Sequence, residues 1–317
     1  MLNLIKNEWI KIFKQVSTYI MIGFLLLVII GVGGITKYVE SKEKPANDNW
    51  KQELTAQNEQ NKQQLADIEF AAPSLKEYLT KETAINEYRI EHNMPPENSY
   101  SVWSFIKDSS DLTSFVGLLV IIIASGIVAH EFSWGTIKIL LIKPYSRWKI
   151  LMAKYITTIL YLLTMLAILF TIVSILGLIL FGKGTGDNVH LAYVNGAVVE
   201  QNLLLYLIKT YILNSLSVFL LTTMAFMISA VFRNSGLAIG ISIFLLLMGG
   251  TITNLLAAKF DWAKYSLFAN TNLMQYVDGM PLVEGMTLSF SIIMIIIYFI
   301  IFHAMAFVFF TKRDIAT

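Results

Sequence analysis

The chain has no cysteine and a small share of charged residues. Without cysteine it forms no disulfide, thiolate zinc site, iron–sulfur cluster or thiol nucleophile. Charged side chains make up 15% of its 317 residues, whereas a soluble domain has about 25%. The formal net charge is only +2, so the chain lacks the basic excess that is typical of nucleic-acid binders. We therefore expect neither a water-soluble globular domain nor a nucleic-acid partner.

Long stretches without Asp, Glu, Lys or Arg occupy much of the sequence. Hydrophobic residues make up 56% of the chain, and the mean hydropathy is +0.61. A helix needs about 20 apolar residues to cross a hydrocarbon core of about 30 Å, and lipid-exposed backbone must be helical or closed into a barrel. The uncharged windows predict an all-α polytopic membrane protein with six transmembrane helices, at residues 17–36, 112–129, 155–182, 205–232, 234–257 and 285–311.

Basic residues in the short connections predict the orientation. Positive charges accumulate in cytoplasmic loops, and loops longer than about 60 residues are left out of the count. With the N-terminus inside, the cytoplasmic segments carry eleven Lys and Arg residues, and the short outer loops carry four. We therefore expect a multi-pass protein of the cell membrane with cytoplasmic N- and C-termini and with residues 37–111 outside.

Three segments outside the predicted spans have a distinct character. Residues 1–16 carry Trp9 and other apolar side chains on one face and lysines on the other, which predicts an amphipathic interfacial helix; the alternative is that they form the first turns of the first span. Residues 37–111 contain two helix-like stretches around Pro73, which predicts an extracellular helical hairpin, or else a solvated spacer. The aromatic-rich residues 258–284 predict an extracellular re-entrant segment of short helices.

Two incomplete motifs argue against an enzyme. Residues 177–183 have the glycine and lysine spacing of a phosphate loop, but Gly184 stands where a magnesium-binding Ser or Thr belongs. The pair at 130–131 begins like a zinc-protease motif, but Trp134 occupies the position of the second His. We therefore expect no catalytic residue, no metal site and no cofactor in this chain.

Small and polar residues inside the predicted spans are candidates for packing and transport. Gly236-x-x-x-Gly240 permits close helix approach, either within the chain or to a second chain. Asn214, Asn254 and His303 lie at membrane depth and need a partner or a wet cavity. We name these three as candidate pathway residues. For His303 the alternative is a neutral ring hydrogen-bonded to a neighbouring helix.

The predicted cytoplasmic loop at residues 130–154 carries the strongest functional signal. Aromatic and basic side chains on a short cytosolic helix are suited to docking in a partner's groove, and contact with lipid head groups is the alternative. The apolar face would consist of Phe132, Trp134, Ile137 and Leu141, before Pro144 ends the first helix and Ser146 caps a second.

The same loop carries a family resemblance. Its spacing Glu131-x3-Gly135-Thr136-x-Lys138, then Pro144 and Ser146-Arg147, resembles the loop between the second and third helices of ABC-2 type permeases, the membrane subunits of bacterial ABC exporters. The resemblance implies that two permease chains, identical or homologous, pair in the membrane. It also implies a separate cytosolic ATPase that holds ATP and Mg²⁺ and contacts this loop. With two aromatic residues added from the docking argument, the candidate coupling residues are Glu131, Phe132, Trp134, Gly135, Thr136, Lys138, Pro144, Ser146 and Arg147.

The expected function follows from this resemblance. It implies the permease subunit of an exporter, and the apolar spans favour a hydrophobic or amphipathic substrate such as a peptide, an antibiotic or a lipid-like compound. One alternative is a non-transporting membrane sensor or mechanical transmitter of an ABC system. Another is a membrane-embedded enzyme, which would need converging polar groups that these spans lack.

Overall fold

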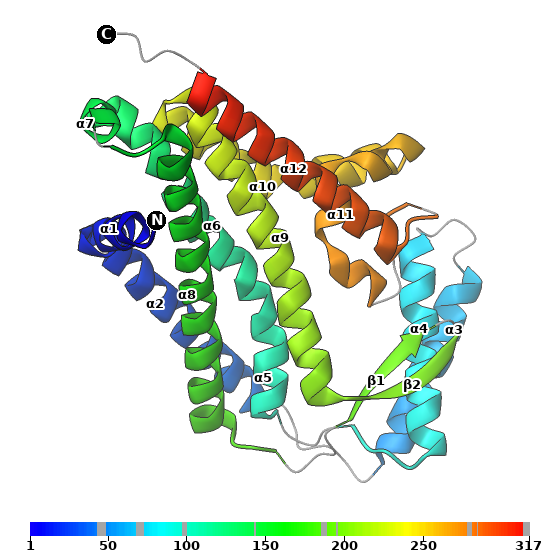
Figure 1. Cartoon of the computed structure of the whole chain (residues 1–317). Coiled ribbons are helices and arrows are strands. Elements are labelled where there is room, and N and C mark those ends of the chain that lie inside the picture. Colours follow the sequence, from blue (N-terminus) through cyan, green and yellow to red (C-terminus); the bar gives the residue numbers. More distant parts are fainter. Residues whose placement is uncertain are drawn as a thin grey trace.

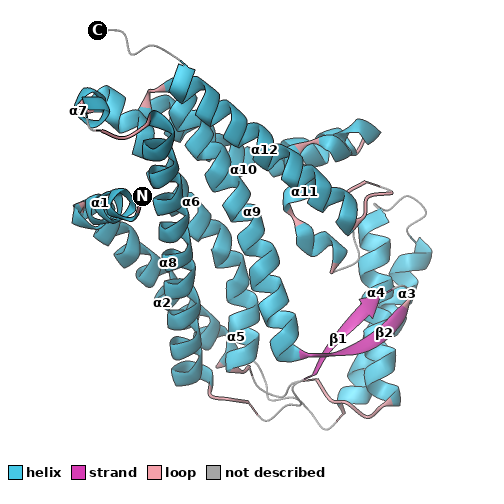
Figure 2. Ribbon diagram, viewed as in Figure 1, coloured by secondary structure: helices cyan, strands magenta, loops and turns pink. Residues whose placement is uncertain are grey.

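The computed structural model describes residues 1–42, 49–67, 73–96, 100–142, 144–184, 189–194, 196–277, 281–283 and 285–312. Helices dominate the described chain, with one two-stranded sheet (Figures 1 and 2). The helices are α1 (Leu2–Lys14), α2 (Val16–Glu40), α3 (Trp50–Asp67), α4 (Pro73–Glu91), α5 (Val102–Asp108), α6 (Leu112–Ser133), α7 (Ile137–Ile142), α8 (Arg147–Phe181), α9 (Leu203–Phe232), α10 (Ser235–Ala257), α11 (Leu267–Thr271) and α12 (Leu288–Lys312), with the 3-10 helices η1 (Ser109–Asp111), η2 (Asp261–Tyr265) and η3 (Leu273–Tyr276) and the strands β1 (Val189–Val194) and β2 (Ala197–Asn202).

Within the described residues, six helical runs are long and apolar enough to cross a membrane, which confirms the predicted multi-pass all-α fold. The helices α2, α6, α8 and α9 are longer than their predicted windows, because a helix does not end where its first charged residue appears, whereas α10 and α12 are slightly shorter than predicted. The second span is preceded by α5 and η1, so that the helical run covers 102–133. The third begins at Arg147, inside the segment predicted as cytoplasmic loop. Only residues 134–146 therefore separate α6 from α8.

The helices α6 and α9 form the centre of the bundle. In each, 67% of the most apolar window is buried, against 28% or less in α2, α8, α10 and α12. Their backbones approach closely because small residues lie between them. A Cβ on Gly117 would lie 3.1 Å from Val218, and the Ala129 N–H donates to Ser229 Oγ at 3.0 Å. The other spans surround this pair and turn apolar side chains outward, as lipid-facing helices do.

The N-terminal helix α1 is separate from the first span. Gln15 has extended backbone angles, φ −79° and ψ 129°, which end α1 and redirect the chain into α2. The hydroxyl of Thr18 donates to the Ile12 carbonyl at 2.6 Å and so satisfies a group at the end of α1. The side chains of Leu4, Glu8 and Ile12 are buried. The predicted helix at 1–16 is therefore present. The helical backbone is interrupted at Gln15, so α1 is a separate helix and not the first turns of the span.

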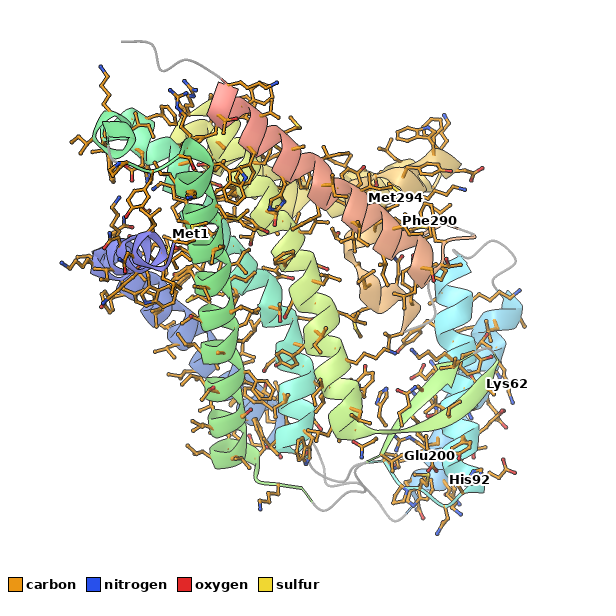
Figure 3. The ribbon with its side chains drawn as sticks, viewed as in Figure 1. Met1, Lys62, His92, Glu200, Phe290 and Met294 are labelled. Atoms are coloured by element: carbon orange, nitrogen blue, oxygen red, sulfur yellow. The ribbon has the colours of Figure 1, made fainter. Side chains whose placement is uncertain are left out.

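Different elements form the two ends of the molecule. At one end, which we call the terminal end, lie α1 with the N-terminus, α7 and the end of α12 (Figure 1). At the other, α3, α4, β1 and β2 form what we call the lobe, with Lys62, His92 and Glu200 labelled on it in Figure 3. Met1 and these three residues lie on opposite sides of the view in Figure 3.

The helices α3 and α4 pack side by side, which confirms the predicted helical hairpin. Their interface is polar rather than apolar. The amide of Asn86 donates to Asn58 Oδ1 at 2.9 Å, and both residues are buried. Among the described residues of these helices, Leu79 alone is a buried apolar side chain. The hairpin is therefore held by amide hydrogen bonds. A sequence analysis that looks for an apolar stripe along each helix does not detect such a polar interface.

The strands β1 and β2 were not predicted. They pair antiparallel, from Val189 opposite Asn202 to Val194 opposite Ala197, and contact α4. The hydroxyl of Tyr88 in α4 donates to Glu200 Oε1 at 3.2 Å. The strands thereby connect the helical hairpin to the start of α9, which follows β2 directly. A two-stranded hairpin is stable only when it packs against other elements. Because that packing involves residues distant in the sequence, the segment between the two spans contained no strong local signal for strands.

The segment between α10 and α12 forms the short helices that were predicted for residues 258–284, while its re-entrant and extracellular position stays a prediction. It contains η2, α11 and η3, while residues 278–280 and 284 lie outside the described part. The buried Asn270 donates to the carbonyls of Lys264 at 2.7 Å and Ser266 at 2.8 Å. It also accepts from Ser291 Oγ of α12 at 2.7 Å. These bonds fasten the short helices to the last span.

Candidate functional site

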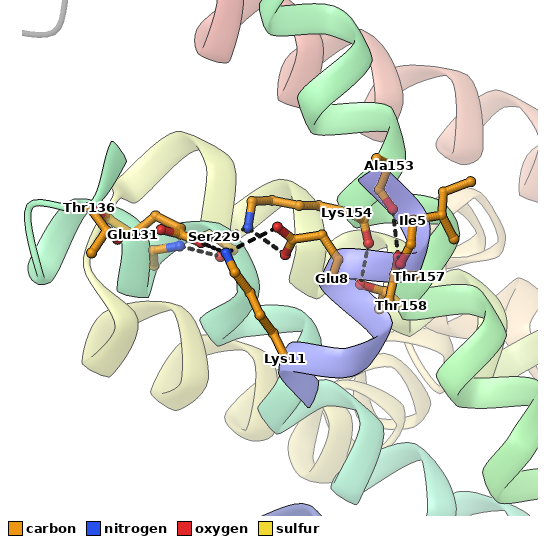
Figure 4. A network of polar contacts seen from close by, with 11 residues as sticks. Ile5, Glu8, Lys11, Glu131, Thr136, Ala153, Lys154, Thr157, Thr158 and Ser229 are labelled. Carbon is orange, nitrogen blue, oxygen red and sulfur yellow. Dashed lines mark hydrogen bonds and ion pairs between the residues drawn. The ribbon is translucent and has the colours of Figure 1, made fainter. Parts of the chain in front are cut away.

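A buried ion network lies at the terminal end, where α1, α6 and α8 meet (Figure 4). Its centre is Lys154 of α8, whose side chain is 1% exposed. The Lys154 ammonium lies 2.8 Å from Glu8 Oε2 of α1 and 3.0 Å from Glu131 Oε1 of α6. A buried charge is costly unless it is paired and hydrogen-bonded, and Lys154 meets both conditions.

A second lysine completes the network. Lys11 of α1 lies 3.2 Å from Glu8 Oε1 and 2.9 Å from Glu131 Oε1. With Lys154, the two ammoniums balance the two carboxylates, so the cluster carries no net charge into the protein. Burial alone would lower the pKa of Lys11, but the carboxylates of Glu8 and Glu131 outweigh it and raise the pKa above its ordinary value. Lys11 therefore stays charged at neutral pH.

The network reaches the loop between α6 and α8 through Thr136. The Thr136 hydroxyl donates to the Glu131 carboxylate and also lies 3.4 Å from the Glu131 carbonyl oxygen. On the other side, the Thr157 hydroxyl of α8 lies 3.4 Å from the Ile5 carbonyl of α1. Three helices and the loop are thus connected through Glu131, and a displacement of the loop would act directly on α1, α6 and α8.

The loop exposes a set of large apolar side chains beside lysines. Gly135 turns the chain after α6 with φ +71°, a conformation that side-chain-bearing residues rarely adopt. The helix α7 follows. We call the exposed set the loop surface: Trp134 (67% exposed), Ile139, Tyr145 and Trp148, with Lys138 and Lys149 among them. Exposed tryptophan and tyrosine side chains are enriched at protein interfaces.

The structure divides the predicted coupling residues into two groups. Trp134, Gly135, Lys138, Pro144 and Ser146 are exposed. The others are engaged within the chain: Glu131 is buried in the ion network, Phe132 lies under the Arg233 guanidinium at 4.4 Å, Thr136 bonds to Glu131, and Arg147 Nη1 donates to the Thr311 carbonyl at 3.3 Å.

The predicted docking helix differs from the observed one. Ile137, expected on the exposed face, is 3% exposed, and Ile139 is exposed in its place. The reason is that α6 continues to Ser133, which rotates the short α7 relative to the expected helix. The side chain of Leu141 and the basic residue at 143 lie outside the described residues. Ser146 stands at the N-cap of α8, but its side chain makes no capping hydrogen bond, contrary to the expected cap.

The candidate pathway residues do not converge. Asn214 of α9 is half-buried, Asn254 of α10 is exposed, and His303 of α12 is half-buried. The His303 ring nitrogen lies 3.0 Å from the Phe299 carbonyl, and its ring packs edge-on against Tyr155 with centroids 4.5 Å apart. His303 is therefore part of an aromatic cluster and bonds within its own helix. No group of three or more His, Asp or Glu side chains among the described residues could hold a metal ion.

The glycine pair of α10 faces outward. A Cβ on Gly240 would have nothing within 4 Å, and one on Gly236 would approach only Asn234 Oδ1, at 3.4 Å. The pair therefore does not pack against another helix in the part of the chain that the structure describes, which argues against one of the two roles considered for it.

Sequence reasoning missed three members of the ion network. Lys11 was assigned to the polar face of an interfacial helix, Lys154 to the end of a loop, and Glu8 was given no role. One signal was available: Glu8 is the one acidic residue before residue 40, and Glu131 is the one acidic residue between Asp111 and the acid at 187. Isolated acids beside apolar stretches need basic partners.

Comparisons with known proteins agree with the membrane fold. A model of the family described as "Protein of unknown function (DUF2705)" matches residues 76–316. The chain belongs to this family. It is 53% identical to the "Uncharacterized protein YhcI" of Bacillus subtilis (strain 168) over 318 residues, which covers 100% of both chains. It is also 30% identical over 213 residues to the "Uncharacterized membrane protein YdbK" of the same organism, covering 67% of this chain and 82% of that protein.

Proposed function

We propose that this DUF2705 protein is the permease subunit of an ATP-driven exporter and that a separate cytosolic ATPase docks on the loop surface. The observation that carries the proposal is the ion network. It connects an exposed aromatic surface around Trp134 through Thr136 and Glu131 to three helices at once. A docking surface with a rigid connection to the central span α6 is what a motor needs to move a membrane domain.

The proposed mechanism assigns a role to each part of the connection. ATP and Mg²⁺ are held by the partner ATPase, and closure of its subunits displaces the loop surface. Glu131 transmits this displacement to α6, while Lys154 carries it to α8 and Glu8 to α1. The network moves as a unit because separating its charges inside the protein costs several kcal/mol, about 3–5 for a broken buried pair. The spans then switch between two arrangements.

The outward face of α10 supports pairing with a second permease chain. Gly240, Phe244, Leu247, Thr251 and Asn254 recur at helical spacing, and all five are exposed. Polar side chains such as Asn254 are unfavourable against lipid and acquire partners when helices associate. This proposal assigns the glycine pair a role at the chain–chain contact. The cargo would pass between the two chains, and the scarcity of charge in the spans favours a hydrophobic or amphipathic compound.

The proposed location is the cell membrane, with the terminal end in the cytoplasm and the lobe outside. The excess of Lys and Arg in the segments at the terminal end supports this orientation. The loop surface and both termini then face the compartment that contains ATP.

Affinity purification of the tagged full chain from its native host tests the proposal. We expect an ABC ATPase to co-purify, and expect Trp134→Ala combined with Trp148→Ala to lose it. The matched control is Trp262→Ala in η2, between α10 and α12, since Trp262 is also exposed, at 56%; this variant should retain the ATPase. If no ATPase co-purifies, or if the control loses it equally, the proposal is wrong. A bound ATPase whose activity drives no substrate efflux from vesicles would favour the sensor alternative.

A further inference from the structure

An open groove of about 400 Å³ lies between α1 and α8 and is separate from the ion network. Hydrocarbon side chains form most of its wall, and two of them, Leu160 (40%) and Leu163 (56%), are strongly exposed. The groove therefore opens toward the lipid and has the volume of an ordinary ligand site. Its lining residues are Trp9, Leu160, Leu163, Thr164 and Ala167.

A positive charge stands at one side of this groove. Lys6 precedes Trp9 by three positions, so the two side chains are neighbours on the surface of α1. Lys6 is exposed, and no ion pair joins it to any residue in the described part of the chain. The one acid of α1, Glu8, is buried and committed to Lys154 and Lys11. Nothing on α1 therefore neutralises Lys6.

We propose that the groove binds one anionic phospholipid, with an acyl chain along Leu160, Leu163 and Ala167 and the head-group phosphate on Lys6. An apolar wall beside an unneutralised cation at an interfacial helix favours such a lipid over a zwitterionic one, whose phosphate is offset by its own ammonium. The lipid would bridge α1 and α8 next to the Glu8–Lys154 pair and help to hold α1 in place. This proposal needs no ATPase and holds or fails independently of the transport function.

Quenching of Trp9 fluorescence by brominated lipids tests the proposal. The chain has six tryptophans, so a variant that keeps Trp9 and replaces the others with Phe reports on the groove alone. It is reconstituted in phosphatidylcholine vesicles that contain a minor fraction of brominated phosphatidylglycerol or, separately, the same fraction of brominated phosphatidylcholine. We expect the anionic lipid to be enriched at Trp9 about fivefold, as one lysine near the membrane surface provides. A second measurement uses the chain with its other tryptophans intact. The difference in quenching between this chain and its Trp9→Phe variant is the contribution of Trp9.

Two pairs of matched variants locate the site. Lys6→Gln should abolish the preference, whereas Lys14→Gln, the same change at an exposed lysine away from Trp9 on α1, should preserve it. Ala167→Leu fills the groove and should weaken quenching by both lipids, whereas Ala304→Leu on the exposed side of α12 should not. Equal quenching by the two lipids would overturn the proposal, because the groove would then have no preference for the anionic lipid. Equal effects of the two lysine changes, or no effect of Ala167→Leu, would also overturn it, because a diffuse attraction of α1 to anionic lipid predicts both results.

Discussion

The ammonium of Lys154 lies 2.8 Å from the carboxylate of Glu8, although 146 positions separate the two residues. The pair joins the N-terminal helix α1 to the start of the third span, and Glu131 joins both to the second. All three side chains are about nine-tenths or more buried. The ion network is stable only when all of its charged side chains are present. A charge that loses its partner stays buried in the protein interior, which solvates it poorly.

Replacing Lys154 with Met should therefore destabilise the chain strongly. The substitution leaves two carboxylates with only the half-exposed Lys11, and loss of one partner of a buried pair costs about 3–5 kcal/mol. Reversible unfolding of the purified chain in mixed detergent micelles measures the change in the free energy of unfolding. Adding Glu8→Gln and Glu131→Gln to Lys154→Met should recover part of the loss, since the orphaned charges are then removed.

The control for this prediction is the exposed ion pair between Lys62 and Glu87 of the lobe, with side chains 60% and 55% exposed. Lys62→Met should cost less than about 1 kcal/mol, as exposed pairs do. A loss of similar size for Lys62→Met and Lys154→Met would contradict the assigned role of burial.

Gly249 of α10 should not tolerate a side chain. A Cβ at this position would lie 2.3 Å from the Phe268 ring, so Gly249→Ala should displace α11 and cost about 1–3 kcal/mol. Gly250→Ala is the matched control, because a Cβ there meets nothing within 4 Å. Thermal unfolding of both variants in detergent checks the difference. Phe268→Leu should partly rescue Gly249→Ala; without such rescue, the contact is not the cause.

The lobe should lose stability as the pH falls from about 6.5 toward 4. Burial first, and then the charges of Lys107, Lys81 and Arg89, lower the pKa of His190 from 6.5 to about 4. In that window the unfolded lobe binds a proton that the folded lobe does not, so its stability decreases with acidification. Hydrogen exchange of residues 189–202, corrected for the intrinsic effect of pH, measures this loss.

Removing the titrating ring should remove this pH dependence. His190 stacks on Tyr206 with centroids 3.6 Å apart, and His190→Phe keeps an aromatic ring in that position. The matched change His92→Phe, at an exposed histidine stacked on Tyr88, should leave the pH dependence intact. The prediction is wrong if His92→Phe abolishes the dependence or His190→Phe preserves it.

The membrane fold was predictable because it depends on a local property. Each span requires about 20 apolar residues in one stretch of chain, so the uncharged windows located all six. The α3–α4 hairpin was predictable for a similar reason, since Pro73 divides two helical stretches. The helix ends were less predictable. The α6 helix passes its first charged residue because Glu131 is neutralised by lysines from α1 and α8.

By itself the sequence determined that this protein crosses a membrane, and it identified the loop after α6 as its most distinctive segment. Tertiary structure decided which residues of that loop face outward. It placed Glu131 inside an ion network, Trp134 and Ile139 on the surface, and Gly236 and Gly240 on a side of α10 that meets no other described helix. Apolar content is summed along the chain, whereas burial and charge pairing depend on residues that are brought together only when distant helices pack.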